Sequence, residues 1–92
     1  MQENTNTVER TVTVASKSGL HARPAGLFVQ GTKGFQCQIT IAKNGKTANA
    51  RSILSVLSLG AEQGDQVVLT ASGIDAEAAI NKLAALLESD HG

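Results

Sequence analysis

The densest group of chemically active side chains is the segment Ser18-Gly19-Leu20-His21-Ala22-Arg23-Pro24. A neutral imidazole nitrogen is a nucleophile, and histidine can form covalent intermediates. Because Pro24 is tolerated in the first turn of a helix, we expect a helix to begin at about Ala22, where unpaired N–H groups attract anions. Arg23 adds a planar, permanently charged group that suits phosphate oxygens. The segment therefore predicts a phosphoryl group carried on His21, while an exposed histidine beside a helix start would show the same spacing.

Ser52 is a second candidate, placed directly before the apolar run 53–59 and the glycine Gly60. Serine is a preferred N-cap residue, typically worth about 1 kcal/mol through a bond to a first-turn N–H. A glycine directly after such a run is a common helix stop. The sequence predicts a short helix that Ser52 caps and Gly60 ends.

Four segments with alternating apolar and polar residues predict the strands that hold these helices. Between the second and the third stands Asn44-Gly45, which favours a type I′ hairpin because both central residues of that turn need positive φ. The returning strand spans 46–50. The apolar faces of the other three strands are Val8, Val12 and Val14, then Cys37, Ile39 and Ile41, and then Val67, Leu69 and Ala71.

Apolar residues that recur every three or four positions predict two longer helices. One runs from about Ala22 to Lys33 and stops at Gly34, and the other begins after Asp75, which we expect to cap it. The element order is strand, helix, strand, strand, helix, strand, helix. One antiparallel sheet with every helix on one face buries all these apolar faces together, so we expect an α+β fold. The apolar faces of the two helices are Ala25, Phe28, Val29 and Thr32, and Ala76, Ala79, Ile80, Leu83, Leu86 and Leu87.

The charges exclude some functions and suggest others. Eight basic and eight acidic residues give a formal net charge of zero, which argues against the basic footprint of a nucleic-acid-binding protein. They are segregated, however, because six basic residues and no acidic one lie between Thr11 and Ala61, and six acidic residues follow from Glu62 onward. We expect the basic segment to draw acidic partner surfaces toward His21.

The length of 92 residues suits one domain, which we place at 8–89 between tails of 1–7 and 90–92. The single cysteine, Cys37, cannot make an intramolecular disulfide, and no Cys/His cluster has zinc-ligand spacing, so we expect no metal and no cofactor. No apolar run approaches the roughly 20 residues needed to cross a bilayer. The polar N-terminus lacks the layout of a signal peptide. We expect a cytoplasmic protein without membrane insertion.

Two motifs carry a resemblance to a known family. The segment Gly19-Leu20-His21-Ala22-Arg23-Pro24-Ala25 resembles the active-site signature of HPr, the histidine-containing phosphocarrier of the phosphoenolpyruvate:sugar phosphotransferase system. Asn44-Gly45-Lys46 with the segment 51–60 resembles the second signature of that family. Ser52 follows His21 by 31 residues, which is the spacing of the regulatory serine in the family. The resemblance covers nearly the whole chain.

The resemblance implies a fold and a role. The fold is an open-faced β-sandwich, a four-stranded antiparallel sheet with three helices on one face (βαββαβα). In such proteins the histidine, here His21, takes a phosphoryl group on Nδ1 from Enzyme I, which phosphoenolpyruvate charges, and passes it to sugar-specific IIA domains. Arg23 would neutralise the phosphate, and Ser18 and the backbone at Ala22 would donate hydrogen bonds to it. The chain would be a carrier, which we expect to be monomeric, and not an enzyme in its own right.

For Ser52, the resemblance to the Gram-positive form implies phosphorylation by HPr kinase/phosphorylase and binding to a catabolite-control regulator. A phosphate there would lie beside a partner-docking patch, for which we nominate Leu20, Ile53, Leu54 and Leu57. Where that form has Lys, Met, Gly and Met, this sequence has Arg51, Leu54, Ser55 and Leu57, which blurs the kinase and regulator that would recognise it. The alternative function is a regulatory paralogue, in catabolite repression or a nitrogen-related branch, that acts mainly as a phosphorylation-dependent binding module.

Overall fold

The strands and helices form in the predicted order. The structure is a computed structural model that describes residues 7–17 and 19–89, so the predicted tails 1–6 and 90–92 lie outside the described residues. The elements are β1 (Thr7–Thr13), α1 (Ala22–Gly31), β2 (Gln38–Lys43), β3 (Lys46–Asn49), α2 (Ile53–Ser58), β4 (Gln66–Ser72) and α3 (Ala76–Glu88).

The first strand begins one residue earlier than the sequence indicates. Thr7, which we assigned to the N-terminal tail, pairs with Ser72 of β4, and the two hydroxyl oxygens lie 3.0 Å apart. The tail prediction is therefore wrong for Thr7, because this cross-strand contact holds the residue in the sheet.

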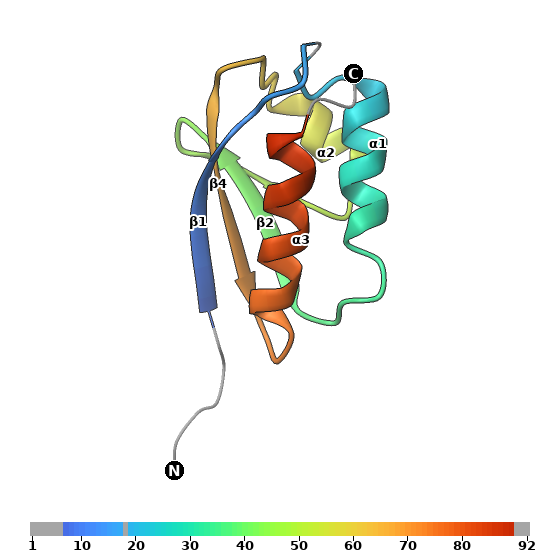
Figure 1. Ribbon diagram of the computed structural model, residues 1–92, viewed down its shortest axis with the longest axis vertical. Coiled ribbons are helices and arrows are strands. Elements are labelled where there is room, and N and C mark those ends of the chain that lie inside the picture. The colour runs from blue at the N-terminus through green and yellow to red at the C-terminus, as the bar shows by residue number, and fades with distance from the viewer. Residues whose placement is uncertain (1–6, 18, 90–92) are drawn as a thin grey trace.

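The four strands form one antiparallel sheet in the order β1-β4-β2-β3. Its register places Ile41 of β2 between Leu69 of β4 and Ala48 of β3. Asn44 and Gly45 join β2 to β3 with φ angles of 51° and 84°, the positive values that a type I′ hairpin requires. Figure 1 shows α1 and α3 side by side on one face of the sheet, with α2 behind them. The α+β open-faced sandwich is confirmed.

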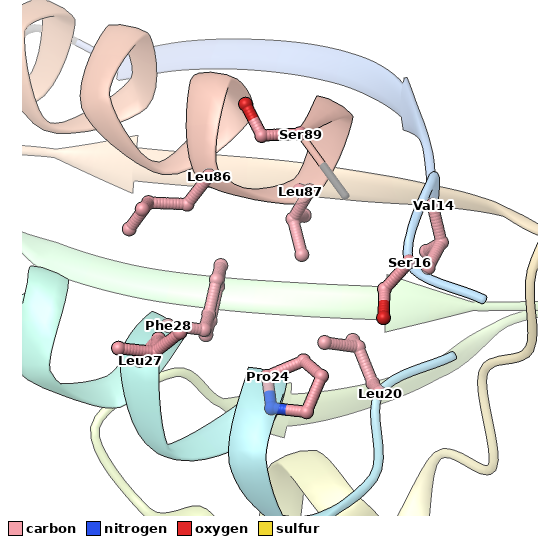
Figure 2. A pocket seen from close by; sticks show the side chains of 9 residues that line it. All are labelled: Val14, Ser16, Leu20, Pro24, Leu27, Phe28, Leu86, Leu87 and Ser89. Atoms are coloured by element: carbon pink, nitrogen blue, oxygen red, sulfur yellow. The ribbon is translucent and has the colours of Figure 1, made fainter. Parts of the chain in front are cut away.

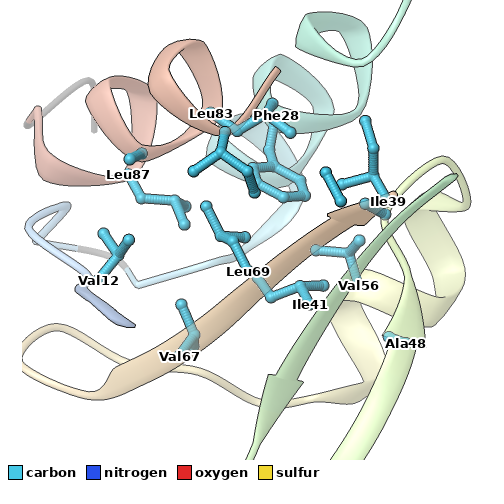
Figure 3. Close-up of a cluster of buried hydrophobic side chains, with 14 of the residues drawn as sticks. Val12, Phe28, Ile39, Ile41, Ala48, Val56, Val67, Leu69, Leu83 and Leu87 are labelled. Atoms are coloured by element: carbon cyan, nitrogen blue, oxygen red, sulfur yellow. The ribbon is translucent and has the colours of Figure 1, made fainter. Parts of the chain in front are cut away.

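The core lies between the sheet and the helices. Phe28 of α1 and Leu83 of α3 are fully buried against Leu69 and Ile41 of the sheet, and Val56 of α2 fills the end beside β3 (Figure 3). Burying one such side chain contributes roughly 1.5–3 kcal/mol. Since each helix supplies a buried residue to the same cluster, the position of the α1 start depends on the whole core.

Helix α1 ends two residues before the predicted Lys33. The N–H of Thr32 donates to the carbonyl of Val29 at 3.1 Å and its hydroxyl donates to the same oxygen at 2.6 Å, so the last turn tightens and the α-helix stops at Gly31. Gly31, the last residue of α1, packs against α3. A Cβ there would lie 2.7 Å from Leu86 Cδ1 of α3, so the Leu86 side chain would have to shift to make room for it.

The Arg51 side chain links the start of α2 to the connection between α1 and β2. Its Nη1 donates to the carbonyl of Thr32 at 2.8 Å, and its Nη2 donates to the carbonyls of Phe35 and Cys37 at 2.8 and 2.7 Å. Thr32 is the C-cap residue of α1, where a positive charge is favourable. Arg51 therefore acts first as a structural clamp in this fold.

We predict that Arg51→Ala lowers the free energy of unfolding by about 1.5–3 kcal/mol, because three carbonyls lose a charged donor. Arg51→Lys should recover only part of this loss, since a single ammonium cannot reproduce the planar fork. Urea unfolding followed by circular dichroism measures both effects. Arg23→Ala is the matched control, because Arg23 is exposed and has no hydrogen bond in the described part of the chain. Equal stability of the Arg51→Ala and Arg23→Ala variants would contradict the clamp.

Asp75 occupies the N-cap position of α3 but does not cap it with its side chain. Its carboxylate instead accepts the N–H groups of Gln36 and Cys37, at 2.8 and 3.0 Å. The predicted side-chain cap is thus wrong, because two unpaired donors at the entry of β2 lie within reach of the same carboxylate. The bond from Gln36, and next the contacts with Cys37, hold the pKa of the Asp75 carboxyl below its usual value.

This shift predicts a pH dependence of stability. A carboxyl whose pKa is lower in the folded state stabilises the fold above its unfolded pKa, about 3.9 for Asp, and loses that contribution as the pH falls through the folded pKa. Asp75→Asn should therefore lower the urea midpoint at pH 7, and the difference from wild type should narrow below about pH 4. Glu9→Gln, at an exposed β1 carboxylate with no hydrogen bond among the described residues, is the control. A difference that persists unchanged at low pH would contradict this account.

Candidate functional site

His21 stands at the N-terminus of α1, as the sequence indicates. It is the N-cap residue, with φ −84° and ψ −168°, and its imidazole makes no capping hydrogen bond. Its carbonyl accepts the N–H of Ala25 at 2.8 Å, which starts the helix. The side chain is exposed, so a partner can reach the ring from solvent.

The helix start leaves two backbone donors beside this histidine. The bond from Ala25 is the first intrahelical one, so the N–H groups of Ala22 and Arg23 precede it, and Pro24 has no N–H. Both donors lie at the positive end of the helix dipole. The Arg23 side chain is exposed at the same place. This arrangement is suited to an anion next to the ring of His21, and the phosphate-binding roles of Ala22 and Arg23 stay predictions.

The loop that carries His21 is held against the connection between α2 and β4. The N–H of Leu20 donates to the carbonyl of Ala61 at 2.8 Å. Gly19 has φ +69°, and a Cβ on it would lie 2.5 Å from that carbonyl oxygen and 2.7 Å from Glu62 Cα. Only glycine fits both the conformation and the space. Ser18, a predicted phosphate ligand, lies outside the described residues.

Leu20 does not belong to an exposed docking patch. Its side chain is only 3% exposed and is part of the core, so the prediction that Leu20 belongs to the docking patch is wrong. The reason is the loop contact just described, which turns Leu20 inward. Ile53 and Leu54 of α2 are exposed, at 38% and 76%, and Leu57 is half-buried. A role in partner docking remains a prediction for Ile53, Leu54 and Leu57.

Two surface hollows flank His21. One, of about 110 Å³, is lined by Leu20, Leu57, Gly60 and Ala61 together with His21 and Glu62. The other, of about 370 Å³, is lined by Lys17 and Gln63, again with His21 and Glu62. Sequence reasoning missed Glu62, since 41 residues separate it from His21 and no motif joins them. The one signal it offered is its place as the first acidic residue after the basic segment.

A third hollow lies behind the His21 loop, between α1 and α3 (Figure 2). It is lined mainly by apolar side chains, including Leu20 and Pro24, and its volume of about 10 Å³ leaves roughly the room of one water molecule. The buried Ser16 hydroxyl borders it and has no hydrogen-bond partner in the described part of the protein. This hollow is too small to hold a substrate. Access to His21 is therefore from the exposed surface and the two hollows beside it.

Ser52 caps α2 as predicted. Its Oγ accepts the N–H of Ser55 at 3.3 Å, and Gly60, with φ +63°, follows the last turn. This hydrogen bond is partly buried. Ile53 and Leu54, which follow it directly, are exposed. A charge added at Ser52 would thus lie beside exposed apolar surface.

The described residues offer no metal site, no reactive thiolate and no membrane-spanning helix. They contain no group of three His, Cys, Asp or Glu side chains that could hold a metal ion. Burial, and next the contact with Asp75, raises the pKa of the Cys37 thiol to about 11, so Cys37 is not a thiolate nucleophile at neutral pH. No helix in the part that the structure describes is long and apolar enough to span a bilayer.

Comparison with known proteins agrees with this geometry. The PTS-HPr family model, described as the PTS HPr component phosphorylation site, matches residues 8–89. The chain is 46% identical to phosphocarrier protein HPr of Streptomyces coelicolor over 80 residues, 86% of each chain. It is 42% identical to the HPr-like protein Crh of Bacillus subtilis over 83 residues, 90% of this chain and 98% of Crh.

Solved structures give the same result. A crystal structure of HPr from Bacillus anthracis superposes with a TM-score of 0.85 at 46% identity, covering 88% of this chain and 96% of that one. The structure of Bacillus subtilis Crh, solved as a domain-swapped dimer, superposes with a TM-score of 0.72 at 43% identity, covering 88% and 93%. The chain therefore belongs to the HPr family, a family of phosphocarrier proteins and not of catalytic enzymes that also includes the HPr-like protein Crh.

Proposed function

We propose that the protein carries a phosphoryl group on His21 from Enzyme I to sugar-specific IIA domains. The observation that carries this proposal is the exposed imidazole at the N-cap of α1, next to two backbone N–H groups without intrahelical partners. Nδ1 attacks the phosphorus of phospho-Enzyme I, a P–N bond forms, and the bond to the donor breaks. In the second transfer the acceptor of the IIA domain attacks, and the electron pair of the P–N bond returns to Nδ1.

The residues around His21 have separate roles in this proposal. The N–H groups of Ala22 and Arg23 donate to the phosphoryl oxygens, and the Arg23 guanidinium offsets their charge. Ser18 is proposed as a further donor on the strength of the family resemblance. No lid is needed, because the same phosphorus must be reached in turn by two different partners.

Partner docking is proposed for Ile53, Leu54 and Leu57. Leu57 lines a hollow with His21, so α2 places apolar surface directly beside the phosphoryl site. The proposal includes a cytoplasmic location and a monomer. The monomer stays a prediction, since the relatives of solved structure include an HPr dimer from Thermoanaerobacter tengcongensis besides the swapped Crh dimer.

We predict that His21→Ala abolishes labelling by radioactive phosphoenolpyruvate and Enzyme I, because the residues that the structure describes contain no other histidine. Arg23→Ala should slow transfer about 10- to 100-fold, the loss expected for one charge-assisted hydrogen bond. His91→Ala replaces the second histidine of the chain and is the matched control. Acid-labile label that persists on the His21→Ala variant would overturn the proposal.

A second candidate function is regulation through phospho-Ser52. It is favoured by the half-buried cap at Ser52, next to exposed Ile53 and Leu54, and by the similarity to Crh. A phosphate there adds about −2 charge at a helix start, which the dipole tolerates, but at the edge of apolar docking surface. We propose that this charge weakens Enzyme I binding and offers a site to a catabolite-control regulator.

We predict a mass gain of one phosphate after incubation with ATP and HPr kinase/phosphorylase, absent in Ser52→Ala. Ser55→Ala, which alters the neighbouring serine and leaves the cap oxygen in place, should still gain it. Intact-mass spectrometry measures the outcome. An unchanged mass of the wild-type protein would exclude regulation by this kinase and leave the carrier function intact.

A further inference from the structure

Glu62 faces the phosphoryl site from the opposite loop. It lines both hollows that flank His21, and the other residues of those hollows are apolar, uncharged or, in the case of Lys17, basic. Among the described residues that line them, Glu62 thus supplies the negative charge. The two hollows share only His21 and Glu62, so these two residues are neighbours on the surface.

The backbone of Glu62 is fixed from both sides. Gly19 packs so closely that its missing Cβ would lie 2.7 Å from Glu62 Cα. On the other side, the N–H of Glu62 donates to Asp65 Oδ2 at 2.8 Å, and the same oxygen lies 2.9 Å from Lys43 Nζ. The bond from Glu62, and next that from Lys43, lowers the pKa of the Asp65 carboxyl, so this anchor is a carboxylate at neutral pH. The side chain of Glu62 is exposed, so a change of rotamer is open to it on the side of His21.

We propose that Glu62 is a positioning residue for the phosphorylated ring, accepting a hydrogen bond from Nε2–H of His21 when Nδ1 carries the phosphoryl group. This inference rests on the proposed function. In a phosphorylated imidazole the two nitrogens lie on opposite edges, so a phosphate held at the α1 start leaves Nε2 available to another element. The partner of one ring nitrogen sets the protonation of the other, and a carboxylate is a common partner.

The proton at Nε2 decides how easily the phosphoryl group leaves. When the P–N bond breaks, its electron pair stays on Nδ1 while the acceptor forms the new bond to phosphorus. With a proton on Nε2 the ring departs as neutral imidazole, and without it the ring must depart as imidazolate, a far poorer leaving group. Glu62 and the phosphoryl group favour this proton, whereas Lys17 and Arg23 oppose it.

The test measures the proton directly, on protein phosphorylated with phosphoramidate so that no partner protein is required. In ¹H–¹⁵N spectra, Glu62→Gln should lower the pH midpoint for loss of the Nε2 proton by about half to one unit, the effect of one nearby charge. Glu62→Asp should restore most of the shift. Glu77→Gln removes the same charge from the first turn of α3, at the opposite end of the molecule from the α1 start (Figure 1), and should leave the midpoint unchanged.

Transfer to a IIA domain supplies a second readout. The rate of Glu62→Gln should equal that of wild type near pH 6 and fall severalfold below it above pH 8, where its Nε2 proton is lost first. Identical midpoints in Glu62→Gln and wild type would overturn the inference. If phosphoramidate gives the expected shift but Enzyme I fails to label the wild type, the carrier function fails and the role of Glu62 stands, so the two failures are distinguishable.

Discussion

The functional surface depends on the contact between the His21 loop and the connection from α2 to β4. One hydrogen bond, from the N–H of Leu20 to the carbonyl of Ala61, and the absence of a Cβ at Gly19 let the two backbones meet. The contact turns Leu20 into the core and leaves His21, the next residue, at the helix start in solvent. Burial of one residue thus determines the exposure of its neighbour. The N-terminus of α1, the two hollows and Leu57 of α2 then lie next to one another at His21.

Part of the positive charge in the middle of the sequence stabilises the fold. Lys43 and Lys46 donate to the carbonyls of Gly60 and Ser58 at the end of α2, at 3.1 and 3.0 Å, and Arg51 donates to the carbonyl of Thr32 at the end of α1. Cations at helix C-termini are favourable because unpaired carbonyls and the negative end of the dipole lie there. Three of the six basic residues therefore have backbone partners.

These contacts reduce the number of basic side chains that are available to attract acidic partners. The segregation of basic residues before Glu62 does not make a uniform basic face, because Lys43 is paired with the Asp65 carboxylate and the side chains of Lys46 and Arg51 are held at backbone carbonyls. Lys17, which borders a hollow with His21, and the exposed Arg23 are the cations nearest the site. Attraction of acidic partners then comes from these residues and from the α1 dipole more than from the net charge of the segment.

The sequence predicts elements well where the signal is local, and poorly where it depends on tertiary contacts. The Asn44-Gly45 hairpin, the Ser52 cap and the helix start at Ala22 are each encoded within about four residues, and the structure confirms them. The predicted side-chain cap by Asp75 and the predicted exposure of Leu20 were wrong, because their partners, Gln36 and Ala61, are about 40 residues away and leave no periodic signal. Glu62 was missed for the same reason.

The small cavities beside His21 follow from what a carrier must do. A catalytic enzyme gains from a closed pocket that excludes water, but a carrier must present the same phosphorus to a donor and then to an acceptor. Under the proposed function, a site open to two partners cannot surround the phosphoryl group, so we expect its stabilisation to come from the N–H donors at the α1 start and from Arg23. Holding the phosphoryl group too firmly would slow the second transfer, since both steps pass through the same intermediate. The proposed role of Glu62 at Nε2 would meet this requirement without further phosphate ligands, because it eases departure of the phosphoryl group and leaves the approach to phosphorus open.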